Sequence, residues 1–218
     1  MTDKTILVVE DDTSVTKLYV QFLEPDYSVL TAETAEEGID ALRKSTARAS
    51  DDTSSAADTE HEPTPTAETN AETETAVDAV LLDRRLPDAP GEKVLDFIEE
   101  NALDCRVAMV TGVEPDFDIV GMGFDLYIVK PVTRSELLEA VETLFVRSEY
   151  GGLLREAASL ASKRALLESE KSDTALTASK EYSTLLERMG ELDDELLDLA
   201  GALSSDDYRV MFRDLGSA

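Results

Sequence analysis

This 218-residue sequence contains one cysteine, one histidine and no tryptophan. The single cysteine, Cys105, excludes a disulfide within the chain and a cysteine-rich zinc site, which suits a reducing compartment. No apolar run approaches the roughly 18 residues that a membrane-spanning helix needs, and the start of the sequence lacks the basic and apolar regions of a signal peptide. We therefore expect a cytoplasmic protein that has no membrane partner.

Basic residues are also scarce in this sequence. The chain has 20 lysines and arginines against 48 acidic residues, which gives a formal net charge of -28. Such a balance repels nucleic acid unless basic groups gather locally. Acidic residues spread over the whole chain are expected of a protein that stays soluble in concentrated salt, where their repulsion is screened. The composition therefore leads to the hypothesis of a halophilic cytoplasm.

Five short apolar runs organise the first two thirds of the chain, at residues 6–9, 27–30, 79–82, 107–110 and 127–129. They are rich in β-branched residues and too short for buried helices. Most show no alternation of polar and apolar positions, which indicates strands buried on both faces of a parallel sheet. Helical patterns separate most of the runs. This order predicts a doubly wound α/β domain with a five-stranded parallel sheet over residues 1–147.

Residues 45–76 interrupt this pattern between the second helix and the third strand. They are mostly threonine, serine, alanine and acidic residues, and they include no Val, Ile, Leu, Met, Phe, Tyr or Trp. Without apolar side chains to bury, the segment cannot offset the entropy of ordering, so we expect a disordered acidic insertion. The only histidine, His61, lies within it and is interpreted as a solvated loop residue rather than a metal ligand.

The pattern changes after about residue 147, where strands end and helical spacing takes over. Apolar residues then advance by three and four positions in alternation, as a heptad seam does: Ala175, Ala178, Tyr182, Leu185, Met189, Leu192, Leu196, Leu199 and Leu203. Residues 148–218 are therefore predicted to form an all-helical, coiled-coil-like domain. The sequence leaves open whether the seam closes within one chain or between two chains.

Polar side chains follow the predicted strands at the points where the strands end. They comprise four carboxylates, one hydroxyl and one ammonium group: Glu10, Asp11, Asp12, Asp83, Thr111 and Lys130. Because the carboxyl ends of parallel strands share one edge of a sheet, we expect these groups to meet there. Two carboxylates about 4 Å apart repel by roughly 4 kcal/mol at an effective dielectric constant of about 20, so such a cluster needs a cation.

The chemistry of this cluster favours phosphoryl transfer. Oxygen ligands without histidine or cysteine select a hard ion such as Mg²⁺. A metal and a lysine aimed at the same space would neutralise the charge on a transferring phosphoryl group while a carboxylate oxygen attacks.

Four motifs occur along the chain in the order VVEDD, LLDRRLPDAPG, VTG and YIVKP. Together they resemble the signature of the two-component response regulator receiver domain, which has a flavodoxin-like fold, over residues 4 to about 146 apart from the insertion. The resemblance implies that Asp83 is the phosphoacceptor and that Thr111 and Lys130 contact the phosphoryl oxygens. It also implies a Mg²⁺ site whose ligands are Asp11, Asp12, Asp83 and the backbone carbonyl of Arg85.

The same resemblance implies a switch and a phosphodonor. Tyr127 would change rotamer together with Thr111 on activation, and the bond from Lys130 to Pro131 would be cis. Receivers take the phosphoryl group from a phosphohistidine of a sensor histidine kinase and catalyse that transfer themselves. We therefore expect a phosphoacceptor signalling protein and not an enzyme that acts on a separate substrate.

Two alternatives to a phosphorylated receiver fit parts of this pattern. A magnesium phosphohydrolase with an aspartyl-phosphate usually carries an Asp-x-Asp pair on its first strand, and EDDTS lacks that spacing. A receiver-like binding module that is never phosphorylated conflicts with the complete set of site residues. One departure from typical receivers is the connection between Thr111 and Lys130, where Pro115, Gly121 and Gly123 leave room for one or two helical turns instead of a full helix.

The C-terminal stretches ASKRALLESEKS and KEYSTLLERMGELDDELLDL are similar to the HalX domain that follows receivers in haloarchaea. This resemblance implies an output domain that regulates transcription, with DNA as a partner. Residues 155–188 hold six basic and six acidic residues, so their charge does not decide between DNA binding and another output. The alternative is that the helices control protein interaction or form a homodimer without direct DNA binding.

Overall fold

The computed structural model describes residues 4–49 and 76–201, with side chains up to Ser45 in the first range. The chain divides into two compact units, Met1–Val141 and Glu142–Ala218. The predicted domain boundary after residue 147 lies close to this division. No helix in the described ranges is long and apolar enough to span a bilayer.

A five-stranded parallel sheet forms the centre of the first unit. Its strands are β1 (Thr5–Val9), β2 (Ser28–Ala32), β3 (Ala79–Leu82), β4 (Arg106–Thr111) and β5 (Leu126–Val129). They are ordered β2-β1-β3-β4-β5, and all four neighbouring pairs are parallel. The predicted doubly wound α/β fold is therefore confirmed, and the carboxyl ends of β1, β3, β4 and β5 lie along one edge of the sheet.

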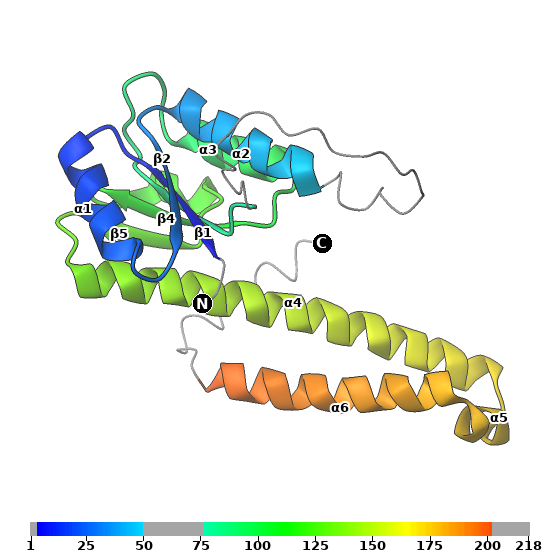
Figure 1. Ribbon diagram of the computed structural model, residues 1–218. Helices are drawn as coiled ribbons and strands as arrows, with labels where there is room; N and C mark the ends of the chain where they lie inside the picture. The colour runs from blue at the N-terminus through cyan, green and yellow to red at the C-terminus, as the bar shows by residue number, and fades with distance from the viewer. Residues whose placement is uncertain (1–3, 50–75, 202–218) are drawn as a thin grey trace, which may run out of the picture. The chain divides into compact units, whose positions relative to one another are not determined.

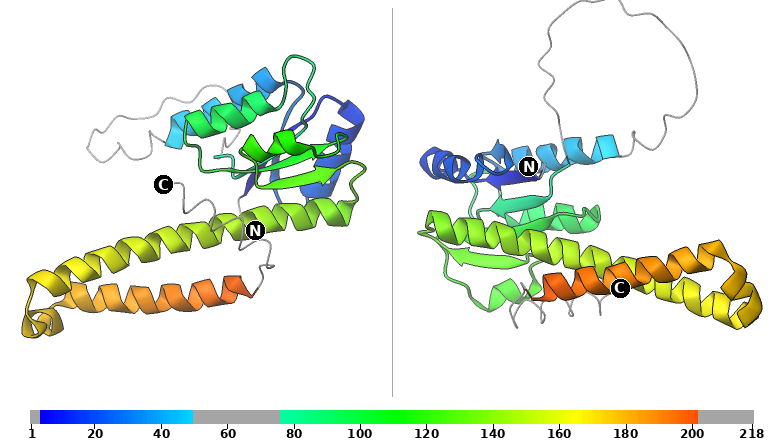
Figure 2. Two further views of the ribbon diagram at one scale, coloured as in Figure 1. Left: turned by 180° about the vertical axis from the view of Figure 1, so that it is seen from behind. Right: turned by 60° about the horizontal axis from the view of Figure 1, so that its bottom comes forward.

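Helices follow the strands along the chain and cover both faces of the sheet (Figures 1 and 2). The described helices are α1 (Thr13–Leu23), α2 (Ala35–Ala49), α3 (Glu92–Glu100), the 3-10 helix η1 (Phe117–Gly121), α4 (Arg134–Glu170), α5 (Asp173–Ala178) and α6 (Lys180–Ala200). Between β4 and β5 there is only η1, five residues long. The prediction of one or two turns in this connection is confirmed.

The central strands show no polar alternation because both of their faces are buried. Leu7 and Val9 of β1 pack in one core cluster with residues of α2 and α3, which lie side by side over one face of the sheet (Figure 1). Ile6 and Val8 point to the opposite face, since side chains alternate along a strand, and they are buried as well. This double burial fixes where each strand ends and so where the polar residues that follow it are placed.

Helix α2 corrects the start of the predicted insertion. Disorder was predicted from Ser45 onward, but α2 continues to Ala49. Alanine and arginine, which are strong helix formers, make up three of the last four helical residues and favour the extension. The rest of the predicted insertion, including His61, lies outside the described residues.

The amino end of α2 is capped from a distant part of the chain. The carboxylate of Asp88, in the loop between β3 and α3, accepts hydrogen bonds from the backbone N–H groups of Ala35 at 2.9 Å and Glu36 at 3.0 Å. These bonds lower the pKa of Asp88, the bond from Ala35 being the largest cause. The loop that follows Asp83 is thereby fixed to α2.

The second unit contains an antiparallel pair of helices, formed by the later part of α4 and by α6 (Figure 2). Arg188 of α6 donates two hydrogen bonds to the Glu156 carboxylate of α4, at 2.9 and 3.0 Å. Tyr182 donates to Glu168 of α4 at 2.7 Å. In the described residues the predicted seam therefore meets a helix of its own chain, and Leu192 is its fully buried member.

The predicted seam is not one continuous helix. It breaks at Ser179, whose backbone is extended and whose hydroxyl accepts from the Tyr182 N–H as the amino-terminal cap of α6. The last residue of the seam, Leu203, lies outside the described residues. A seam of correct spacing thus does not exclude a break where a serine can cap a new helix.

Candidate functional site

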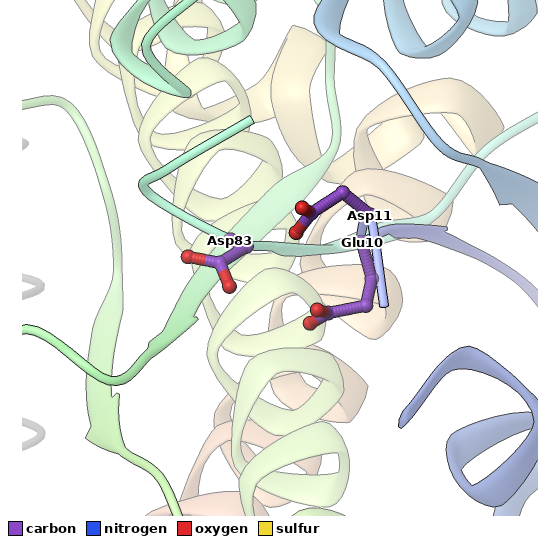
Figure 3. Close-up of side chains that lie close together, drawn as sticks. All are labelled: Glu10, Asp11 and Asp83. Carbon is purple, nitrogen blue, oxygen red and sulfur yellow. The ribbon is translucent and has the colours of Figure 1, made fainter. Parts of the chain in front are cut away.

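Three carboxylates meet where β1 and β3 end. Glu10 and Asp11 follow β1 directly, Asp83 follows β3, and one oxygen atom of each lies within 4.8 Å of the others. Figure 3 shows the three carboxyl groups directed into the same small region from the ends of these two strands. Glu10 and Asp83 are buried, whereas Asp11 is exposed. The predicted carboxylate cluster is therefore present at this edge of the sheet.

The backbone around Asp83 is held tightly. The Asp83 N–H donates to the Val9 carbonyl at 2.9 Å, which extends the ladder between β1 and β3 by one bond. One Asp83 carboxylate oxygen accepts from the Arg85 N–H at 3.0 Å. Gly91 closes the loop so closely that a Cβ atom there would overlap the Asp83 carbonyl oxygen. These contacts fix the carboxylate with one oxygen bound to the loop and the other directed toward Lys130.

Lys130 connects two of the three carboxylates. Its Nζ lies 2.5 Å from an oxygen of Asp83 and 2.5 Å from an oxygen of Glu10. The backbone N–H of Lys130 donates to the Thr111 carbonyl at 2.8 Å. The peptide bond from Lys130 to Pro131 is cis, as the resemblance implied. Burial lowers the pKa of Lys130, but its hydrogen bonds with Asp83 and Glu10 outweigh burial and raise it overall.

Burial shifts the pKa of Glu10 upward, whereas it shifts that of Lys130 downward. Removal from water raises the pKa of Glu10 above its usual value, although the hydrogen bond from Lys130 acts against this. A buried carboxylate beside two others is costly to keep ionised with a single ammonium group as counter-charge. The cluster therefore has more negative charge than Lys130 can offset.

The structure places Asp12 differently from its neighbours. Its carboxylate caps α1 by accepting the N–H groups of Ser14 at 2.8 Å and Val15 at 3.3 Å. These bonds, with that from Ser14 the largest cause, lower the pKa of Asp12. Asp12 lines the same cavity as the cluster but contributes no oxygen to it. The residue that joins Asp11 and Asp83 is Glu10, which sequence analysis placed at the edge of the sheet but left out of the metal ligands.

Thr111 and Tyr127 lie on neighbouring strands beside the cluster. Thr111 ends β4 and is buried. Tyr127 lies in β5, donates its hydroxyl hydrogen to the Val113 carbonyl at 2.8 Å and packs against Phe124 with ring centres 5.5 Å apart. The backbone N–H of Val113 also donates to the Thr111 hydroxyl oxygen at 3.4 Å. The two predicted switch residues are thus joined through Val113, in the short segment after β4.

The cluster opens into a cavity of about 450 Å³ that is lined by Glu10, Asp11, Asp12, Val15, Asp83, Arg85, Thr111, Gly112, Val113 and Lys130. Every residue that the sequence assigned to metal binding or phosphoryl contact is among them. The donor set suits Mg²⁺, because it offers hard oxygen ligands, surplus negative charge and space for bound water. The side chains and the loop at Arg85 therefore fit the metal that the resemblance implied.

Comparison with known families agrees with this architecture. Residues 50–142 match the response regulator receiver domain, and residues 146–212 match the HalX domain. The first match leaves out β1 to α2, but the structure shows that these elements complete the same sheet. The fold and the acidic cluster thus define the first unit as a response regulator receiver domain. The C-terminal helices belong to a HalX domain, so the chain joins a receiver to a HalX output domain.

Two curated proteins are similar to parts of this chain. A Haloferax volcanii protein described as "Putative transcriptional regulator" is 57% identical over 93 residues, which is 43% of this chain and 16% of that protein. The alkaline phosphatase synthesis transcriptional regulatory protein PhoP of Bacillus subtilis is 30% identical over 151 residues, 67% of this chain and 50% of that protein. The chain spans half or less of the length of these relatives.

Solved structures show the same fold. The CheY-like response regulator receiver domain protein from Methanospirillum hungatei has 25% sequence identity and a TM-score of 0.51, and the match covers 68% of this chain and 98% of that one. The signal receiver domain of a "putative Luxo repressor protein" from Vibrio parahaemolyticus has 23% identity and a TM-score of 0.52, and that match covers 70% and 97%. The fold shared with these proteins is that of the first unit.

Proposed function

We propose that this chain is a phosphorylation-switched response regulator in which Asp83 accepts a phosphoryl group from the phosphohistidine of a sensor histidine kinase. The observation that carries the proposal is the placement of the Asp83 carboxylate within one cavity beside two further carboxylates and 2.5 Å from the Lys130 ammonium group. This arrangement combines a nucleophile, a cation-binding cluster and a fixed positive charge in one place.

Each residue of the site has a distinct proposed role. An oxygen of Asp83 forms the new bond to phosphorus while the bond from phosphorus to the donor imidazole breaks. Lys130 and Thr111 contact the phosphoryl oxygens. Mg²⁺, when bound, would neutralise negative charge on the transferring group, and its proposed ligands are Glu10, Asp11, Asp83 and the backbone carbonyl of Arg85. Asp12 keeps α1 in place beside them.

Direct phosphorylation tests the role of Asp83. The full chain is incubated with Mg²⁺ and phosphoramidate or acetyl phosphate, and its mass is measured. Wild-type protein should gain one phosphoryl group, and Asp83→Asn should gain none. Asp96→Asn, an exposed carboxylate of α3, serves as the matched control and should be labelled like the wild type. A label that persists in Asp83→Asn would contradict the assignment.

For the output we propose regulation of transcription through the HalX domain. Two curated relatives are described as transcriptional regulators, which supports this proposal without defining how the present chain reaches its target. Footprinting on genomic DNA fragments in molar KCl, with and without phosphorylation, tests for direct DNA binding. Selective protection in either state would support it.

A second candidate output is protein interaction or dimerisation through the same helices. It is favoured by two large apolar side chains that lie on the surface of the helices, Leu166 of α4 and Leu197 of α6. Sedimentation of the full chain before and after phosphorylation separates the two candidates when combined with footprinting. A phosphorylation-dependent mass increase without DNA protection would favour protein interaction.

A further inference from the structure

Arg84 follows the proposed phosphoacceptor directly, yet its side chain leads away from the carboxylate cavity. It does not line the cavity that contains Asp83 and Lys130. Arg84 belongs to the loop between β3 and α3, and its side chain is only 14% exposed. A guanidinium group that is largely removed from water needs partners.

The partners of Arg84 come from different elements of the receiver. Its Nε donates to Glu92, the first residue of α3, at 3.0 Å, and its Nη2 donates to Asp118 of η1. The bond with Asp118 raises the pKa of Arg84, and further side-chain hydrogen bonds with Tyr127 and Glu92 act in the same direction. The planar guanidinium can hold groups on two sides in fixed directions, which a lysine cannot do.

The backbone of Arg84 is as firmly held as its side chain. Its carbonyl accepts the Gly91 N–H at 2.8 Å, and Gly91 lies against the Asp83 carbonyl too closely for any side chain. A displacement of the Asp83 backbone is therefore passed to Arg84 and not absorbed by a flexible loop.

The segment η1 has little apolar packing to hold it. None of its residues is buried, and Phe117 and Val120 are 91% and 81% exposed. Its amino end is capped only locally, by the Asp116 carboxylate. The ion pair with Arg84 therefore holds a segment that core contacts do not fix.

We propose that Arg84 is a positioning residue that couples the state of Asp83 to the connection between β4 and β5. It holds η1 through Asp118, so phosphorylation of Asp83 changes the exposure of η1 by way of Arg84. This inference rests on the proposed phosphorylation of Asp83, but it is independent of whether the output is DNA binding or protein interaction.

The decisive variant is Asp118→Asn in the full chain, because it leaves the pair of Arg84 and Glu92 intact. Hydrogen exchange of the amides of residues 117–121 is compared before and after treatment with Mg²⁺ and phosphoramidate. Loss of an ion pair with one exposed partner should speed exchange in η1 about two- to fivefold in the untreated protein. In Asp118→Asn, phosphorylation should no longer change the hydrogen exchange of η1. Asp83 should still be phosphorylated to the same extent as in the wild type.

Two further variants make the test specific. Glu114→Gln removes a negative charge from the same connection without touching Arg84, and it should behave like the wild type. Arg84→Met should reproduce the effects of Asp118→Asn and shift the resonance of a fluorinated Tyr127. Arg84→Lys should restore only part of the wild-type behaviour, since lysine lacks the planar fork.

The outcomes separate this inference from the function on which it rests. Normal labelling of Asp83 combined with unchanged η1 exchange in both Asp118→Asn and Arg84→Met would overturn the role of Arg84 alone. Absence of label on the wild-type protein would overturn the phosphorylation of Asp83 and the coupling together.

Discussion

The receiver and the helical pair carry their polar residues in opposite ways. At the edge of the sheet, buried carboxylates share Lys130, and apolar strands on both sides fix their positions. In the helical pair, Arg188 meets three exposed glutamates on α4 and α6. Buried charge is costly, so its concentration at the edge of the sheet supports the proposed site, whereas exposed pairs in the helices are typical of a solvated surface.

The largest effect should come from Lys130→Met. Removal of the ammonium group takes away the fixed charge that is proposed to face the phosphoryl oxygens, and the loss of one such group costs about 100-fold or more in rate. The initial rate of labelling by phosphoramidate measures this. Lys4→Met is the matched control, because Lys4 pairs with Asp78 at the opposite end of β1. A Lys130→Met protein that is labelled at the wild-type rate would contradict the proposed role.

A pair of leucine substitutions tests the difference in packing between the receiver core and the surface of the helical pair. Leu7 of β1 is fully buried, whereas Leu197 of α6 is 71% exposed. Leu7→Ala should lower the free energy of unfolding of the receiver by about 3 kcal/mol, because it leaves a cavity in the core. Leu197→Ala should change stability by less than about 0.5 kcal/mol. Chemical denaturation followed by circular dichroism measures both, and similar losses in the two variants would refute the contrast.

A moderate effect is expected from Asp88→Ala, which removes the distant cap of α2. The folded-state pKa of Asp88 lies below its unfolded value because backbone N–H groups, that of Ala35 first, bind the carboxylate. The cap therefore stabilises fully above the unfolded pKa of about 3.9, and its contribution is lost as pH falls through the folded pKa. The variant should melt a few degrees below the wild type at neutral pH.

Melting temperatures measured over a range of pH test whether the Asp88 cap causes this loss of stability. The difference in melting temperature between the variant and the wild type should shrink below about pH 4, where the unfolded carboxyl group is protonated. Glu100→Ala, an exposed acid at the end of α3, is the control for general loss of charge. A difference that stays constant down to acid pH would exclude the cap as its cause.

The sequence predicts some residues of the site better than others. Asp83, Thr111 and Lys130 were found because each follows an apolar run, and burial of both sheet faces brings the ends of these runs together. Within EDD, the metal ligands predicted from the sequence were Asp11 and Asp12, whereas in the structure Glu10 and Asp11 are the acids that meet Asp83. The predicted strand end at Val9 is correct, but it does not show which of the following acids caps α1, and that acid is Asp12.

Other features leave no local trace in the sequence. The cap of α2 joins residues 53 positions apart, and the ion pair of Arg84 with Asp118 joins residues 34 apart. Neither separation corresponds to a helical or strand period, so only the folded chain reveals these contacts. The break at Ser179 was missed because the heptad spacing continues across it, and a serine within a helical pattern is a weak signal until its hydroxyl is seen to cap α6.

The smallest effect should come from Arg188→Gln in the helical pair. Burial contributes little here: the glutamate partners of Arg188, Glu156 first among them, are exposed and Arg188 itself is only half-buried, so salt screens their attraction. In low salt the variant should melt slightly below the wild type, and in molar KCl the difference should vanish. Lys180→Gln, which removes a positive charge from the start of α6, is the matched control. Labelling of Asp83 should be unchanged in both variants, because the site is complete within the receiver. A large loss of stability in molar KCl would mean that the Arg188 network resembles the buried cluster of the receiver in energy, and the contrast between the two regions would then fail.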